Sequence, residues 1–324
     1  MISIDPFSEI SFASNLENFA LRIFQYQIKN CKVYGDYVRL LRRPEPKTIA
    51  EIPFLPIQFF KTNTIYCGEK TEKDVLFLSS GTETPERSKH FVRDIELYKT
   101  SFRTSYRQFF GEISEHVILA LLPNYLEQGN SSLVYMVETL IRDSKNDLSG
   151  FLLNEPLQVA ARYKKARAEG KKVVIIGVSY ALMDLADKQI DLQGAIVIET
   201  GGMKGRRQEL SKNELHLALM HGLNVPVIYS EYGMTELLSQ AYSFEKGVFS
   251  CPPWMKVLFR EINDPLTLIG GNGKGAINVI DLANVHSCSF IATQDLGRNV
   301  DGGFVLEGRM EQSDLRGCNL MLDI

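Results

Sequence analysis

Hydrophobic positions over the first 240 residues fall into two kinds of stretch, which alternate along the chain. Short continuous apolar runs are typical of buried strands, and apolar residues that recur with a period near 3.6 are typical of helices. The predicted strands are Asp74–Leu78, Val117–Leu122, Lys172–Gly177, Ala195–Glu199 and Val225–Tyr229. The predicted helices are 11–43, Arg93–Phe110, Ser131–Asp143, Pro156–Glu169, Tyr180–Lys188 and Lys204–His221. Strands that alternate with helices favour βα units and a largely parallel sheet. A proline-rich segment over 44–61, predicted to be an extended loop, separates the first helical stretch from the first of these strands.

The pattern changes after Gln240, where short strand-like runs are joined by glycine- and asparagine-rich turns without helices between them. These runs are Val248–Cys251, Trp254–Arg260, Ala276–Asp281, Phe290–Thr293 and Gly303–Glu307. Such spacing predicts a small, mainly antiparallel β subdomain. We therefore expect an α/β fold in three parts: a region over 1–240 with a mainly parallel sheet flanked by helices, a β-rich subdomain over 241–310, and a tail over 311–324.

Composition and charge exclude several classes of protein. The 324 residues are 44% hydrophobic, and 36 Lys and Arg against 39 Asp and Glu give a net charge of −3, which argues against a nucleic-acid binder. No apolar run reaches the roughly 18 residues that span a bilayer. The first 15 residues contain no basic residue, so they do not form a secretory signal. The five cysteines form no CxxC pair, which argues against a disulfide framework or a zinc site and favours the cytoplasm.

Histidine spacing gives no support for a metal site. His216 and His221 are five residues apart on a predicted helix, so they lie on different faces, whereas metal-binding pairs favour a spacing of four. We expect both to be solvated.

A candidate phosphate-binding loop follows the first predicted strand. Six of the twelve residues from Ser79 to His90 are Ser, Thr or Gly, whose hydroxyls and amides can surround an anion, and Lys89 adds positive charge. The loop is not a Walker A motif, because it lacks a Gly-Lys-Ser or Gly-Lys-Thr sequence. Taken alone, a Ser/Thr/Gly-rich segment after a strand is more often a simple turn.

Four further motifs combine glycines with polar side chains. They are Glu199–Arg206, Tyr229–Glu236, Thr293–Arg298 and Gly308–Cys318. Paired glycines let a flat ligand approach the backbone, an aromatic ring can stack on a base, and a carboxylate can hold Mg²⁺ or accept hydrogen bonds from ribose hydroxyls. Each motif alone is also explained by a glycine turn, a helix start or a strand end, so only their order is informative.

That order resembles the adenylate-forming superfamily of acyl-CoA synthetases, adenylation domains and luciferases. In that family a Ser/Thr/Gly-rich loop precedes a Gly-Gly adenine loop, a Tyr-Gly-Met-Thr-Glu box, an Asp-Leu-Gly ribose box and a Gly-Arg box. The matching positions here are Ser79–Lys89, Gly201–Gly202, Tyr232–Glu236, Asp295–Gly297 and Gly308–Arg309. The resemblance covers residues 75–318. Two departures are expected: Glu83-Thr84-Pro85 stands in the first loop where most relatives have Thr-Gly-X-Pro, and the C-terminal lid domain of most relatives, with its catalytic lysine, is expected to be absent.

Within the superfamily the chain looks most like the acyl-protein synthetases of the LuxE type (long-chain-fatty-acid–luciferin-component ligases), which are related to phenylacetate-CoA ligases. The similar segments are SSGTE, RSKH, ETGGMKGR and RGCNLM. This resemblance implies activation of a fatty acid with ATP and Mg²⁺, followed by thioester formation on a cysteine near the C-terminus, here Cys318. It also implies that the C-terminal lid domain of most superfamily members is absent.

The resemblance assigns a role to each matching residue. Ser79, Ser80, Gly81, Thr82 and Lys89 would hold the phosphates; Gly201, Gly202, Tyr232 and Gly233 would frame the adenine; Thr235 would contact the α-phosphate and Glu236 the Mg²⁺; Asp295 and Arg309 would bind the ribose. Cys318 would carry the acyl group. From its position alone, and not from the resemblance, Lys204 is the candidate for the cation that a lid otherwise provides. A carboxylic acid is the expected substrate, and an acceptor protein, a carrier protein or CoA is the expected partner.

Three alternatives remain open at this stage. The acyl group could pass to CoA or a carrier protein while Cys318 is idle. The chain could instead be a non-catalytic nucleotide-binding subunit. Finally, Gly177–Ala181 is close to the nucleophile elbow of α/β-hydrolases, in which Ser179 would require Asp264 or Asp281 together with His286.

Overall fold

One continuous sheet of twelve strands runs through the part of the chain described by the computed structural model, residues 16–79, 87–123, 130–201, 210–244 and 247–310. Its first half is parallel, in the order β5-β4-β6-β7-β8. These strands are β4 (His116–Leu121), β5 (Gly150–Phe151), β6 (Lys172–Val178), β7 (Ile196–Thr200) and β8 (Tyr229–Tyr232). All six residues of β4 are buried, because helices cover both faces of this half, as is usual for parallel sheets.

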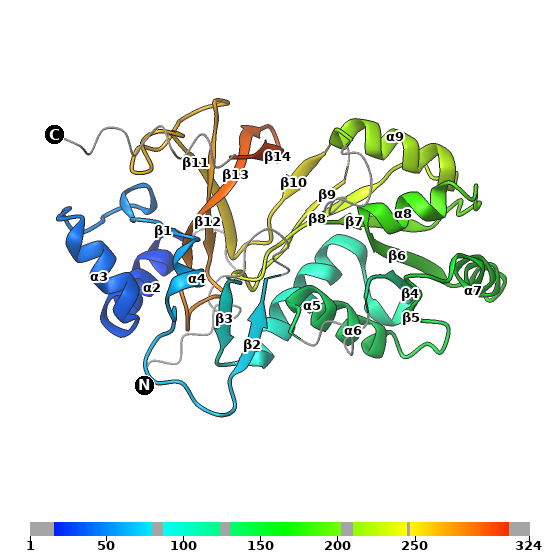
Figure 1. Cartoon of the computed structure of the whole chain (residues 1–324), viewed down its shortest axis with the longest axis horizontal. Helices are drawn as coiled ribbons and strands as arrows, with labels where there is room; N and C mark the ends of the chain where they lie inside the picture. The colour runs from blue at the N-terminus through cyan, green and yellow to red at the C-terminus, as the bar shows by residue number, and fades with distance from the viewer. Residues whose placement is uncertain (1–15, 80–86, 124–129, 202–209, 245–246, 311–324) are drawn as a thin grey trace.

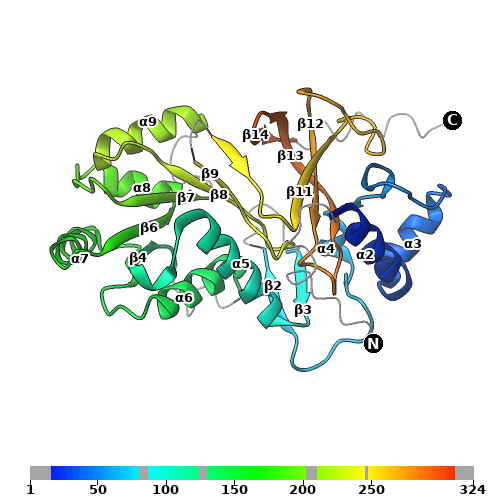
Figure 2. The same cartoon turned by 180° about the vertical axis from the view of Figure 1, so that it is seen from behind.

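The helices of the parallel half lie on opposite faces of the sheet. Helices α5 (Ile95–Phe110) and α6 (Ser132–Ser144) cover one face, and α8 (Ser179–Ala186) and α9 (Lys212–Leu223) cover the other, with α7 (Pro156–Ala168) beside β6 (Figures 1 and 2). The last parallel strand, β8, also pairs with β9 and so joins this half to the antiparallel half.

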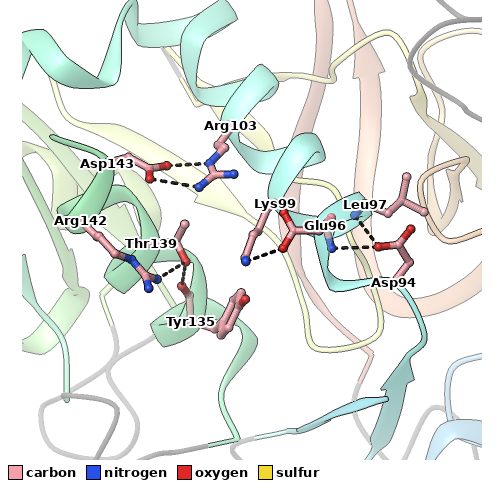
Figure 3. Close-up of polar contacts among 9 residues, drawn as sticks. All are labelled: Asp94, Glu96, Leu97, Lys99, Arg103, Tyr135, Thr139, Arg142 and Asp143. Atoms are coloured by element: carbon pink, nitrogen blue, oxygen red, sulfur yellow. Dashed lines mark hydrogen bonds and ion pairs between the residues drawn. The ribbon is translucent and has the colours of Figure 1, made fainter. Parts of the chain in front are cut away.

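Side-chain hydrogen bonds fix where α5 begins and join it to α6 (Figure 3). The carboxylate of Asp94 accepts hydrogen bonds from the amides of Glu96 and Leu97 at 3.0 and 3.3 Å, which satisfies donors that the helix itself leaves unpaired. The guanidinium of Arg103 meets both oxygens of Asp143 at 2.6 and 3.0 Å, a bidentate contact between the two helices.

The second half of the sheet is antiparallel and continues from β8. Its order is β9-β10-β14-β13-β12-β11, with β1 added parallel to β13. The strands are β9 (Ala241–Ser243), β10 (Val248–Ser250), β11 (Met255–Arg260), β12 (Lys274–Asp281), β13 (Phe290–Val300), β14 (Gly303–Arg309) and β1 (Leu55–Pro56). The predicted fold class, a mainly parallel sheet flanked by helices with a smaller antiparallel part, is confirmed.

The N-terminal helices pack on this antiparallel half rather than on the parallel one (Figure 1). The side-chain amide of Gln27, on α2 (Leu16–Asn30), donates to the carbonyls of Asn284 and Val285 at 3.0 Å. The predicted helical stretch over 11–43 is helical over most of its described residues, but it forms two helices, since the chain breaks at Cys31 and restarts as α3 (Lys32–Leu40). The predicted extended loop over 44–61 contains η1 (Ile49–Glu51), β1 and the start of α4 (Phe59–Thr62).

Two strand predictions need correction. The run Asp74–Leu78 forms β2 (Val75–Leu78), but β2 pairs antiparallel with β3 (Lys89–Val92) in a separate hairpin and not in the parallel sheet. The run Val225–Tyr229 overlaps β8 only at Tyr229. The reason is local: α9 ends with Asn224 in a left-handed conformation, and Pro226 lacks the amide that a central strand needs.

The predicted boundary at residue 240 falls between β8 and β9, which are hydrogen-bonded neighbours. The division into 1–240, 241–310 and 311–324 therefore stays a prediction, and its third part lies outside the described residues. Within the described ranges, no helix combines the length and apolar character needed to cross a bilayer.

Candidate functional site

The described residues of the candidate motifs gather where the parallel half of the sheet meets the antiparallel half. Tyr232 ends β8, Asp295 lies in β13, and Arg309 ends β14. Gly201 follows β7, and Lys89 begins β3. Ser79, Gly233, Thr235 and Glu236 are also described. Six candidates lie outside the residues that the structure describes: Ser80, Gly81, Thr82, Gly202, Lys204 and Cys318.

Three motifs converge on the carboxylate of Asp295. The hydroxyl of Tyr232 donates to Asp295 Oδ2 at 2.9 Å, and Nε of Arg309 lies 3.7 Å from Oδ1. Burial raises the pKa of Asp295, whereas Arg309 and the hydrogen bond from Tyr232 oppose that rise. The ring of Tyr232 packs edge-on against Phe249 and Phe304, so its hydroxyl is held in place. The result is a carboxylate held at the end of β8 by two neighbouring motifs.

Local backbone features explain the position of Asp295. The strand register shifts between Ala276 and Asn278 opposite β13, and such irregularities often re-aim a side chain beside a functional site. The buried guanidinium of Arg260 donates to the carbonyl of Thr293 at 2.7 Å, while the Thr293 hydroxyl accepts from the amide of Asp295 at 3.1 Å. Gly297 completes the Asp-Leu-Gly segment, because a Cβ there would collide with the carbonyl of Val305.

The turn after β8, which contains Thr235 and Glu236, is held by its backbone. The carbonyl of Thr235 lies 2.7 Å from Nδ1 of His90, and the carbonyl of Glu236 accepts from the side-chain amide of Asn284 at 2.7 Å. Farther along, Asp281 accepts from the amide of Leu238 at 2.7 Å. The turn is therefore attached to both the β2–β3 hairpin and the end of β12.

His90 is fully buried between two hydrogen-bond acceptors. Its Nε2 lies 3.1 Å from Oδ1 of Asn284, and that orientation of Asn284 is fixed because its amide nitrogen donates to the carbonyls of Glu236 and Cys288. Burial lowers the pKa of His90 to about 4, so the ring is neutral at pH 7. A neutral ring donates through Nδ1 to Thr235, the shorter contact.

The carboxylate of Glu236 is buried and close to the other motifs. Only 5% of Glu236 is exposed, and burial raises its pKa. A hydrogen bond from the Ser88 side chain and the charge of Arg309 act in the opposite direction, and the charge of Asp295 adds to the rise. The charges of Arg309 and Asp295 therefore both act on the Glu236 carboxylate. Through Ser88, Glu236 also contacts the residue that precedes β3.

The described ends of the candidate phosphate loop face this turn. The hydroxyl of Ser79 accepts from the amide of Ser88 at 2.9 Å, and the Ser79 amide donates to the Ser88 carbonyl at 3.1 Å. Lys89 is exposed beside them. Because Ser88 and His90 both contact the Thr235–Glu236 turn, the loop emerges next to the carboxylate that was predicted to hold Mg²⁺.

A buried charge network beneath Gly201 was not predicted. Glu199, the second-last residue of β7, is 1% exposed and forms an ion pair with Lys212 of α9. The hydroxyl of Ser179 donates to Glu199 Oε1 at 2.6 Å, and that of Ser230 donates to Oε2 at 3.1 Å. Ser179 Oγ also lies 2.9 Å from the carbonyl of Gly201, whose positive φ of 74° suits glycine.

The prediction of two solvated histidines is wrong for His216. Its Nε2 lies 3.1 Å from the Ser230 hydroxyl, and burial lowers its pKa. His221 is exposed as expected.

A second unpredicted carboxylate, Glu231, lies on the opposite face of the sheet from Glu199. Strand side chains alternate in direction, so Glu199 pairs with Ser230 and Thr200 pairs with Glu231. The Thr200 hydroxyl donates to Glu231 Oε2 at 2.5 Å, and burial raises the pKa of Glu231 to about 7. A Cβ at Gly233 would collide with the Glu231 carboxylate, which explains the glycine in this box.

The alternative hydrolase triad is not assembled. Ser179 is 1% exposed, and its hydroxyl contacts Glu199 and Gly201. His286 instead lines a small cavity with Arg93, while Asp281 accepts hydrogen bonds from Leu238 and Ser239. Ser179 therefore starts α8 as a structural residue and not as an exposed nucleophile.

Among the described residues we searched for clusters of metal ligands and for cavities that could hold a ligand. No group of three or more His, Cys, Asp or Glu in those ranges is arranged to hold a metal ion. A cavity of about 580 Å³ lies beside α8. Its lining includes Leu121, Leu153, Ala181 and Leu185, and none of the candidate motif residues. The motif residues and this cavity are thus separate features.

Comparisons with known proteins establish the fold. No family model matches the sequence, and neither does any curated protein. A 2-hydroxyisobutyryl-CoA ligase, in the postadenylation state in complex with 2-HIB-AMP, has a TM-score of 0.66 and 10% identity over 92% of this chain and 67% of its own. MatB from Rhodopseudomonas palustris has a TM-score of 0.53 and 14% identity over 73% of this chain.

O-succinylbenzoate coenzyme A synthetase from Bacillus subtilis, in complex with AMP, has a TM-score of 0.50 and 18% identity over 73% of this chain. This chain spans 48% of the length of MatB and 61% of the synthetase. At these identities the similarity establishes that this chain shares a fold with these ligase and synthetase structures.

Proposed function

We propose that this chain activates a carboxylic acid with ATP, releasing pyrophosphate and forming an acyl-adenylate, and that the acyl group then passes to a thiol. The observation that carries the proposal is the convergence of Tyr232, Asp295, Arg309 and Glu236, which come from three separate motifs. The shared fold with ligases whose structures contain acyl-adenylates or AMP supports it.

Adenylation requires two anions to meet while charge develops on the α-phosphorus, so the protein acts mainly by positioning and electrostatics. In this proposal Asp295, fixed by Tyr232, accepts hydrogen bonds from the ribose hydroxyls. Arg309 and Lys89 attract the anionic nucleotide, with Ser79, Ser80, Gly81 and Thr82 around its phosphates. Gly201, Gly202 and Gly233 admit the adenine, and Thr235 meets the α-phosphate. Lys204 supplies the positive charge that a C-terminal lid domain provides in other members of the superfamily.

Glu236 fits a role in holding Mg²⁺. Its carboxylate is buried beside Arg309 and Asp295, and Mg²⁺ is commonly bound by one or two carboxylates together with substrate phosphates. The ion, when bound, would offset phosphate charge. The Ser88 side chain contacts this carboxylate, and His90 and Asn284 hold the backbone carbonyls of Thr235 and Glu236.

For the acceptor thiol we propose Cys318, as in the acyl-protein synthetases that the sequence resembles, and a fatty acid as the substrate. A thiolate would attack the carbonyl of the acyl-adenylate, displace AMP and leave a thioester. The reaction needs ATP, and the cysteines lack the spacing of a disulfide framework, so we propose that the protein acts in the cytoplasm.

Intact-protein mass after incubation with ATP, Mg²⁺ and a panel of fatty acids tests this assignment. An ATP-dependent mass gain in the wild type that is lost in Cys318→Ala identifies an acyl-protein synthetase and its chain length. No gain, but pyrophosphate release once CoA or a carrier protein is added, assigns the acyl group to a separate thiol. Tight ATP binding without either result identifies a non-catalytic nucleotide-binding subunit.

A further inference from the structure

Two cysteines far apart in sequence face each other near the N-terminal helices. Cys31 lies at the junction of α2 and α3, and Cys67 lies in the segment that leads to the β2–β3 hairpin. The two residues form an isolated antiparallel β-bridge. Both are fully buried.

The hydrogen bonds around this bridge define its geometry. The amide of Gly68 donates to the carbonyl of Asn30 at 2.9 Å, one residue outside the pair on each side. The Cys31 amide donates to Gln27, and the Cys67 amide donates to His286, so the cysteines do not bond to each other through their backbones. They form a non-hydrogen-bonded pair, in which the Cα atoms are about 4.5 Å apart and the side chains are closest.

The thiols differ in their surroundings. The Cys67 thiol donates to the carbonyls of Ser287 and Val285 at 3.4 and 3.6 Å. The neighbouring Cys67 side chain lowers the pKa of Cys31 to about 7 against the effect of burial, whereas Cys31 and burial raise the pKa of Cys67. Cys31 therefore has the greater thiolate fraction, and Cys67 lies opposite it across the bridge.

We propose that Cys31 and Cys67 are a redox-active pair that forms a reversible disulfide. The Cα separation of such a bridge lies within the range of about 4.4 to 6.8 Å seen in disulfides. With hydrogen peroxide as oxidant, the Cys31 thiolate attacks one peroxide oxygen, which breaks the O–O bond and yields a sulfenic acid and hydroxide. The Cys67 sulfur then displaces the sulfenic hydroxyl, and the two protons from the thiols leave in two water molecules.

The third buried cysteine of this region, Cys288, is a poorer partner. Its thiol donates to the carbonyl of Phe290 at 3.4 Å, and burial raises its pKa well above the usual range. Cys288 is also outside the bridge register that brings Cys31 and Cys67 together.

The disulfide would fasten α2 and α3 to the segment around Cys67. That segment is already attached to the loop after β12, because Ser287 donates to the carbonyl of Ile65 at 3.0 Å and the Cys67 amide donates to His286 at 2.9 Å. The oxidised protein should therefore resist thermal unfolding better than the reduced protein. This inference is independent of the proposed function.

The test is peptide mapping of the full chain after hydrogen peroxide treatment, alkylation of free thiols and digestion with trypsin without reductant. The expected product joins the peptide Asn30–Lys32 to the peptide Thr62–Lys70, lacks the mass of two hydrogen atoms, and disappears with dithiothreitol. The melting temperature should rise on oxidation and return on reduction.

Variants identify the partners. Cys31→Ser and Cys67→Ser should each abolish the linked peptide, whereas Cys288→Ser and Cys251→Ser should retain it. The wild-type map decides the question even if a variant does not fold. Two alkylated peptides without a link, a link from Cys31 to Cys288, or sulfinic acid on Cys31 without a link would each overturn the proposal.

Discussion

The hydroxyl of Tyr232 donates a 2.9 Å hydrogen bond to the carboxylate of Asp295, although 63 residues separate the two in sequence. The contact joins the last strand of the parallel half to a strand of the antiparallel half. The sequence alone gives only the order of these two motifs along the chain, whereas the contact shows that they meet in space. Arg309, from a third motif, lies 3.7 Å from the same carboxylate.

Removal of this hydrogen bond should weaken nucleotide binding without unfolding the protein. In Tyr232→Phe the ring packing against Phe249 and Phe304 is kept, but Asp295 loses a donor that orients it. We expect the Kd for ATP to rise about fivefold, the effect of one hydrogen bond of about 1 kcal/mol. Isothermal titration calorimetry measures it. Tyr229→Phe, in the same strand, is the matched control, and equal effects in both variants would contradict the assignment.

His90 should be important for stability because its buried ring donates to the backbone carbonyl of Thr235. His90→Leu leaves that carbonyl without its donor in a buried site and removes a fully buried ring. We expect the free energy of unfolding to fall by about 2 to 4 kcal/mol. Urea unfolding followed by circular dichroism gives the value. In the control His221→Leu, on the exposed side of α9, the change should stay within about 0.5 kcal/mol.

Gly233 should resist any side chain. In Gly233→Ala the new Cβ would collide with the Glu231 carboxylate, so the turn or the carboxylate must move. We expect a loss of about 1 to 3 kcal/mol in the free energy of unfolding. Gly270→Ala is the control, because no atom lies within 4 Å of a Cβ there. If the collision is the cause, a Glu231→Ala background should reduce the cost of Gly233→Ala; an unchanged cost would point to another contact.

The buried Glu231 should make stability depend on pH. Its pKa is raised by burial from the usual 4.5 to about 7, so the folded state holds this proton more tightly than the unfolded state does. Between pH 4.5 and 7 its contribution to the free energy of unfolding should therefore fall as pH rises, by at most about 1.4 kcal/mol per pH unit.

Glu231→Gln isolates that contribution, since the amide does not titrate. The difference in unfolding free energy, wild type minus variant, should decrease from pH 4.5 to pH 7 and then level off. Urea unfolding at pH steps across that range measures it. A difference that is constant with pH would show that Glu231 has an ordinary pKa in the folded protein.

Much of the parallel half could be predicted from the sequence because its strands are buried on both faces. The run Val117–Leu122 corresponds to β4 within one residue at each end, since six consecutive apolar or buried positions leave little ambiguity. Helices α6 and α7 were likewise predicted within one residue, owing to regular apolar spacing and clear starts at Ser131 and Pro156.

Pairing of short strands could not be predicted in the same way. β2 has four residues, of which only Phe77 is buried, and nothing in that pattern distinguishes a hairpin from a parallel strand. β9 is a three-residue strand defined by its neighbours β8 and β10, so no periodicity indicated it. Such elements depend on tertiary contacts that a local pattern does not contain.

The candidate site was predicted in its motifs but not in its supporting residues. Tyr232, Asp295 and Arg309 were identified from sequence order, and the structure brings them together. His90 and Asn284 were missed because their role is to hold backbone carbonyls 145 and 48 residues away. Glu231 had one available signal, its position beside Gly233 within the box, since a glycine there makes room for a neighbouring side chain.

The central claim, adenylation at the Asp295 site, is tested most directly by ATP–pyrophosphate exchange in the presence of Mg²⁺ and a panel of carboxylic acids. The account predicts exchange that depends on an acid in the wild type. Asp295→Asn should weaken it about 10- to 100-fold, as expected for loss of a charged acceptor worth about 1.5 to 3 kcal/mol. Glu307→Gln, an exposed carboxylate on the neighbouring strand that pairs with Arg298, should leave it unchanged. Acid-dependent exchange that persists in Asp295→Asn, or no exchange with any acid in the wild type, would contradict the account.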